Sequence, residues 1–100
     1  MKRMSKKSRT KGAEGERELA RILEGERTSM IGKASPDVTA GPKYGSVQFE
    51  VKRRAKSFTT LYLAMEQAYE LGNHLVAVRD DRQEWLVVMP LSEWMGEREQ

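Results

Sequence analysis

Residues Ser35 to Lys52, SPDVTAGPKYGSVQFEVK, decide the fold, because they read as two strands joined by a turn. Glycine and proline in the middle of this stretch mark the turn. Polar and apolar residues then alternate, as in a strand with one buried face, and the polar positions are Gln48, Glu50 and Lys52. We therefore predict a β-hairpin whose strands carry Asp37 and Glu50, and the sequence leaves its register open.

Helical and strand patterns continue on both sides of this hairpin. Before it, residues 11–24 are predicted to form a helix with Thr10 as N-cap and Gly25 at its C-terminal end, and residues 27–32 a short strand. After it, the predicted elements are a helix over 59–72, strands over 75–78 and 85–89, and a short last helix capped by Ser92. The order α-β-β-β-α-β-β-α predicts an α/β protein.

Length and charge predict one domain with a basic arm. A chain of 100 residues is the size of one ordinary domain, so we expect a flexible arm over residues 1–11 and a single domain over residues 12–100. Residues 1–12 carry six Lys or Arg and no acid, whereas residues 13–100 have a net charge of −3. A second basic cluster, KRRAK, occupies residues 52–56. A basic terminus can be simply solvated, but two clusters favour a nucleic-acid partner.

Composition excludes several kinds of chemistry. The chain has no Cys and one His, His74, which removes thiolate nucleophiles, Cys-based zinc sites and most serine–histidine catalysis. Neither a stretch of about 20 apolar residues nor a signal-peptide pattern is present. We expect an intracellular, cytoplasmic protein without membrane contact. The compact size and basic arm would suit a viral or plasmid-borne protein acting in the host cytoplasm.

Four residues form the candidate catalytic site. Asp37 and Glu50 can meet across the hairpin, and Lys52 shares the face of Glu50. Glu16 falls on the apolar face of the first helix, which comprises Ala13, Leu19, Ala20 and Leu23. Carboxylates beside a phosphate would need a divalent cation, and oxygen ligands favour Mg²⁺ or Mn²⁺. Such a metal would polarise a phosphoryl oxygen while the lysine orients water, which is phosphodiester hydrolysis.

Plainer interpretations stay open. Glu16 could lie at the margin of the apolar face and pair with Arg17 or a downstream lysine. The hairpin could be an ordinary surface with cross-strand ion pairs, which contribute about 0–1 kcal/mol each. The acidic residues would then carry no chemistry.

The sequence also resembles a known family. The motifs are KGAEGERELARILE (Lys11 to Glu24), Arg27, SPDV (Ser35 to Val38), FEVK (Phe49 to Lys52) and LY (Leu61-Tyr62). Together they resemble the archaeal-type Holliday junction resolvases of the PD-(D/E)XK nuclease superfamily, over about residues 11–65. The resemblance implies a restriction-endonuclease-like domain with a central mixed five-stranded sheet flanked by helices.

The resemblance also implies roles for individual residues. Asp37 and Glu50 would bind Mg²⁺, for which Mn²⁺ would substitute, with the Val51 carbonyl as a further ligand. Lys52 would serve the attacking water, and Glu16 would complete the acidic cluster. Members are homodimers that cut opposing strands of a four-way DNA junction. The sequence leaves open whether Ser29 or Ser35 matches the active-site serine of the family, and whether Gln67 reaches the site.

The predicted DNA contacts combine the resemblance with the basic clusters. They are Lys11, Arg17, Arg27, Lys33, Arg53, Arg54 and Lys56. The leading hypothesis is a structure-selective endonuclease that resolves junctions and recognises shape and phosphates. A nuclease of the same superfamily acting on flaps or forks, and a non-enzymatic nucleic-acid-binding module, are the alternatives.

Overall fold

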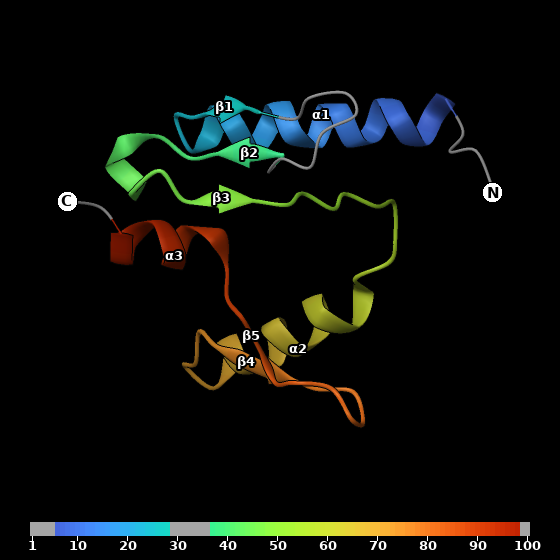
Figure 1. The fold of residues 1–100 in the computed structure, drawn as a ribbon. Helices are drawn as coiled ribbons and strands as arrows, with labels where there is room; N and C mark the ends of the chain where they lie inside the picture. The colour runs from blue at the N-terminus through green and yellow to red at the C-terminus, as the bar shows by residue number, and fades with distance from the viewer. Residues whose placement is uncertain (1–5, 29–36, 99–100) are drawn as a thin grey trace. The chain divides into compact units, whose positions relative to one another are not determined.

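The computed structural model describes residues 6–28 and 37–98, which form two compact units. The first unit contains the described residues up to Ala55 together with Arg98, and the second spans Lys56–Glu97. The element order along the chain is the predicted α-β-β-β-α-β-β-α, so the α/β class is confirmed (Figure 1). The five strands form a three-stranded and a separate two-stranded sheet, both antiparallel, and the predicted single mixed sheet is not confirmed. The expectation of one domain over residues 12–100 stays a prediction.

A helix and a three-stranded sheet make up the first unit. Its elements are α1 (Lys6–Ile22), β1 (Glu26–Arg27), β2 (Val38–Thr39), a 3₁₀ helix η1 (Pro42–Tyr44) and β3 (Gln48–Phe49). The strand order is β1-β2-β3, and both pairings are antiparallel. The central strand, β2, therefore connects α1 and β1 on one side with the predicted catalytic strand on the other.

Helix α1 begins earlier than the sequence predicts. It starts at Lys6, so Thr10 lies inside the helix and the prediction of Thr10 as its N-cap is wrong. Lysine, arginine and serine are compatible with a helix interior, which is why the basic segment can continue it without apolar residues. The rest of the predicted arm, residues 1–5, and most of the predicted strand over 27–32 lie outside the described residues.

The C-terminal end of α1 turns sharply into β1. Glu24 has a left-handed backbone with φ of 52°, and the Gly25 N–H donates to the Ala20 carbonyl at 2.8 Å. Together with the bond from Glu24 N–H to the Arg21 carbonyl, this is a Schellman motif. The left-handed residue is thus Glu24 and not the predicted Gly25. Gly25 is needed because a Cβ there would collide with the Thr39 carbonyl and lie 2.8 Å from Ala40 Cα.

The core of the first unit lies between α1 and β2. Its buried hydrophobic residues are Ala20, Leu23, Val38, Ala40 and Tyr44. Leu23 and Val38 are fully buried, and the Gly41 N–H donates to the Leu23 carbonyl at 2.9 Å. This contact satisfies one of the free carbonyl groups at the helix end and fixes α1 along the sheet. The predicted apolar face of α1 is therefore the face that packs on the sheet.

The second unit consists of α2 (Thr59–Glu70), β4 (Val76–Val78), β5 (Leu86–Val88) and α3 (Leu91–Arg98). Ser92 lies inside α3, so the prediction that it caps this helix is wrong. None of the described residues of this unit is fully buried. Several large apolar side chains are strongly exposed: Tyr62, Tyr69, Leu71, Leu75, Trp85, Leu86 and Val87. In the described part of the chain no helix has the length and apolarity needed to span a membrane.

Substituting Gly25→Ala will destabilise the protein. The new methyl group would meet backbone atoms of Thr39 and Ala40, which cannot move aside as a flexible side chain can. We expect the free energy of unfolding to fall by about 1–3 kcal/mol, measured by urea denaturation with far-UV circular dichroism. Gly12→Ala is the matched control because a Cβ at Gly12 has no atom within 4 Å. Equal stability of the two variants would contradict the close approach.

Candidate active site

The predicted site lies where the β2–β3 ladder ends. Val38 pairs with Phe49, and beyond this pair the Asp37 N–H donates to the Phe49 carbonyl at 2.9 Å. The Val51 N–H, two residues beyond β3, donates to the Asp37 carboxylate, Oδ2, at 2.8 Å. The half-buried Asp37 side chain therefore ties the end of one strand to the segment that leaves the other.

The register that the sequence left open places the two predicted acidic residues on adjacent strand segments. Extending the Val38–Phe49 pairing by one residue places Asp37 opposite Glu50. Glu50 and Lys52 face each other with Oε1 and Nζ 3.3 Å apart. Both side chains are exposed, at 74% for Glu50 and 58% for Lys52. The edge of the hairpin thus presents a carboxylate and an ammonium group to solvent.

Glu16 has a defined partner on the sheet. Its Oε2 lies 2.8 Å from Nη2 of Arg27, and its side chain is only 15% exposed. The burial agrees with a carboxylate on the packed face of α1. The partner of Glu16 is Arg27, and not Arg17 or a downstream lysine. From the sequence, Arg27 was predicted to contact DNA. The pair neutralises a shielded charge and fixes the guanidinium group of β1 against α1.

The donor chemistry of the hairpin edge fits Mg²⁺ in part. Mg²⁺ is commonly held by one or two carboxylates together with waters and substrate phosphates, and Asp37 and Glu50 supply two carboxylates on adjacent strands. Within residues 6–28 and 37–98, no three acidic or histidine side chains form a group that could hold a metal ion. The assignment of Asp37, Glu50, the Val51 carbonyl and Glu16 as metal ligands therefore stays a prediction.

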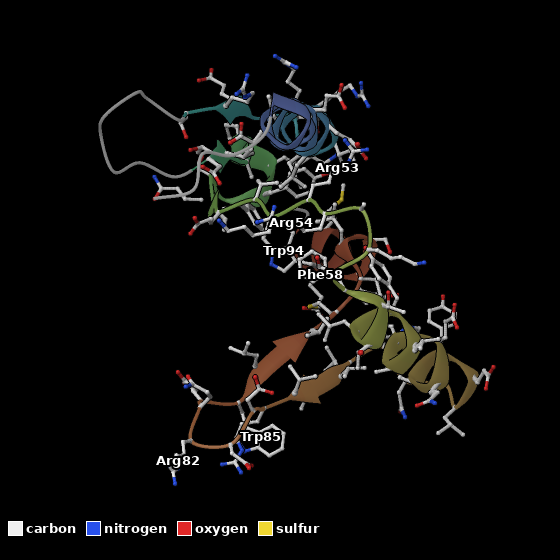
Figure 2. The ribbon with its side chains drawn as sticks, turned by 90° about the vertical axis from the view of Figure 1, so that its right-hand side faces the viewer. Arg53, Arg54, Phe58, Arg82, Trp85 and Trp94 are labelled. Atoms are coloured by element: carbon white, nitrogen blue, oxygen red, sulfur yellow. The ribbon has the colours of Figure 1, made fainter. Side chains whose placement is uncertain are left out.

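The basic residues that follow β3 are held by the protein itself. Nη1 of Arg53 lies 3.3 Å from Oε2 of Glu14, and Figure 2 shows Arg53 beside α1. Nη1 of Arg54 donates to the Arg53 carbonyl at 3.2 Å. Glu14 was not among the residues predicted from the sequence. The signal that could have found it is Gly15, since a glycine within a helix usually has a packing reason.

The remaining predicted contact residues are exposed or lie outside the description. Arg17 and Lys56 are exposed, as is Gln67 on α2. The side chain of Lys11 and the whole of Lys33, Ser29 and Ser35 lie outside what the structure describes. The predicted DNA-binding roles and the open question of the active-site serine therefore stay predictions.

Comparison with known proteins gives one match. The family model described as archaeal Holliday junction resolvase matches residues 7–100, which is nearly the whole chain. No match was found among curated proteins or among solved structures.

A double-mutant cycle will measure the coupling between Glu16 and Arg27. We expect Glu16→Gln and Arg27→Gln to show a coupling energy of about 1 kcal/mol in urea unfolding, because the two groups are in contact and Glu16 is shielded from water. The same cycle with Glu24 and Lys43, an exposed pair 3.8 Å apart, is the control and should give about 0.3 kcal/mol or less. A coupling energy near zero for Glu16 and Arg27 would contradict the pair.

Proposed function

Because the chain belongs to the archaeal Holliday junction resolvase family, and is thus an endodeoxyribonuclease, we propose that Asp37, Glu50 and Lys52 carry out metal-dependent, paired phosphodiester hydrolysis on four-way DNA junctions. The observation that carries the assignment to these residues is the end of the β2–β3 ladder. There, the Asp37 carboxylate accepts a hydrogen bond from the Val51 N–H, and a second carboxylate and a lysine lie on the same strand segment, on either side of Val51.

Asp37, Glu50 and the Val51 carbonyl would hold the metal ion, for which Mg²⁺ or Mn²⁺ is the expected choice. When bound, such an ion polarises a phosphoryl oxygen and makes a bound water more acidic. The hydrogen bond from Val51 supports this assignment, because it orients the Asp37 carboxylate and leaves one of its oxygens available.

Lys52 would act on the attacking water and on the phosphate. Its ammonium group lies beside Glu50, so it is already at the edge where the phosphate would approach. There it can donate a hydrogen bond to the water and stabilise the negative charge that develops on the phosphoryl oxygens. Arg27, held by Glu16, has further N–H groups with which to bind a backbone phosphate.

Paired cutting would require two active sites, and we propose a homodimer. A monomer rarely exposes many large apolar side chains together, and the second unit exposes Tyr62, Leu71, Trp85 and Val87 by 62–80%. A protein of two identical chains would place two equivalent sites on a junction of matching symmetry.

The decisive experiment is cleavage of a labelled four-way junction beside a linear duplex, a flap and a fork. We expect symmetric nicks in the junction with Mg²⁺ and none with a chelator. If the protein cuts flaps or forks and not junctions, the assignment of the active-site residues would stand, but the proposed substrate would be wrong. Tight binding without cleavage of any substrate would refute the proposal.

Substitutions will test the residues. Asp37→Asn retains an oxygen acceptor for the Val51 N–H, so the fold should persist while junction cleavage falls by about 100-fold or more, as when one charged catalytic group is lost. Lys52→Met should also lower junction cleavage by about 100-fold or more while the fold persists. Junction affinity without metal, measured by gel shift, should stay within about threefold, because phosphate contacts elsewhere dominate binding. Gln48→Ala, also on an exposed face of β3, is the control.

The oligomeric state can be measured directly. Sedimentation equilibrium should give twice the monomer mass of 11.5 kDa. The double substitution Trp85→Ser and Val87→Ser should shift the equilibrium towards monomer, because it removes exposed apolar area from the second unit. A wild-type protein that stays monomeric both alone and on a junction would contradict the dimer.

A further inference from the structure

Lys52 lies in a segment that no secondary structure fixes. Strand β3 ends at Phe49 and helix α2 begins at Thr59, with no helix or strand between them. The residues on either side of Lys52 are nevertheless anchored. Val51 is held by its N–H bond to Asp37, and Arg53 is held by α1. The position of Lys52 therefore depends on two anchors, of which only the first belongs to the hairpin.

The second anchor consists of two neighbouring residues of α1. The carboxylate of Glu14 lies 3.3 Å from the guanidinium group of Arg53. At Gly15, an added Cβ would be 2.9 Å from Arg53 Cβ and 3.0 Å from its Cδ. The aliphatic part of Arg53 thus crosses α1 at Gly15, where the helix has no side chain, while the guanidinium group reaches Glu14.

A glycine at position 15 lowers the stability of the helix that contains it. Glycine is a poor helix former, and Gly15 lies within a helix of 17 residues. Gly15 is buried beneath Arg53. An alanine at this position would favour helix formation, but its methyl group would displace the arginine. Gly12, three residues earlier in the same helix, has no atom within 4 Å of an added Cβ. The close contact is specific to the glycine that faces Arg53.

The Arg53–Glu14 ion pair is too exposed to contribute much to the free energy of folding. The side chains of Arg53 and Glu14 are 44% and 55% exposed, and pairs of this kind contribute little to folding. A fixed geometry of the segment is what these contacts provide. A small displacement of a catalytic group lowers the rate of a reaction strongly even when the fold is intact.

We propose that Glu14 and Gly15 are positioning residues, which hold Arg53 against α1 and thereby keep Lys52 at the edge where Glu50 lies. The inference rests on the proposed function, since it concerns the lysine assigned there to the reaction. Arg53 then has a structural task in place of the phosphate contact that the sequence suggested.

The first test uses the metal-free protein and does not depend on activity. Hydrogen–deuterium exchange of a peptide covering residues 48–55 should become about threefold or more faster in Glu14→Gln, because the segment loses an anchor. Glu18→Gln is the matched control, since it removes the same charge from an exposed position of the same helix. Unchanged exchange in Glu14→Gln and in Gly15→Ala would overturn the inference.

The second test separates positioning from DNA binding. In single-turnover junction cleavage, Glu14→Gln and Gly15→Ala should cut about tenfold more slowly at saturating protein, with junction affinity unchanged within about twofold. Gly12→Ala and Glu18→Gln should cut like wild type. If Arg53 instead bound phosphate, removing the Glu14 charge would tighten binding without slowing cleavage, and that result would overturn the inference.

The failure of the proposed function is distinguishable from the failure of this inference. A wild-type protein that cuts no junction would refute the proposed function, whatever the variants do. A wild-type protein that cuts junctions, with Glu14→Gln and Gly15→Ala equally active, would refute the positioning role alone.

Discussion

The hydrogen bond from the Val51 N–H to the Asp37 carboxylate is the contact on which the candidate site depends. It joins the residue before β2 to the segment that follows β3, beside Glu50 and Lys52. The bond fixes the direction of the Asp37 carboxylate. The candidate site thus lies in the irregular segments next to the strands, where functional residues are often found.

Helix α1 both packs on the sheet and holds charged side chains of other segments. The chain packs on β2 through Leu23, just after α1, while the carboxylates of Glu16 and Glu14 hold Arg27 of β1 and Arg53 of the segment after β3. These two arginines are 26 positions apart in the sequence, at residues 27 and 53. One helix turn thereby contributes to the placement of two cations from distant parts of the unit. The helix acts as a scaffold for charges as well as a cover for the core.

The sequence predicted most of this unit and could not predict how its charges pair. Alternation from Val47 to Val51 predicted the strand that the structure has as β3, because a period of two is a local property. The register, and the choice of Arg27 as partner of Glu16, depend on contacts between distant residues, which local patterns do not encode. The start of α1 was placed too late because its first turns have no apolar residue to reveal the helical period. The single mixed sheet was expected from a resemblance, and the described strands form two sheets.

The two ion pairs of α1 also imply an order of assembly. Glu16 and Arg27 are separated by 11 positions along the chain, whereas Glu14 and Arg53 are separated by 39. Closing the longer loop costs about 1 kcal/mol more chain entropy by the logarithmic dependence on loop length. During synthesis, Arg27 also emerges well before Arg53. Chain entropy therefore favours the Glu16–Arg27 contact over the Glu14–Arg53 contact, and we expect the segment that carries Lys52 to be the later of the two to become fixed.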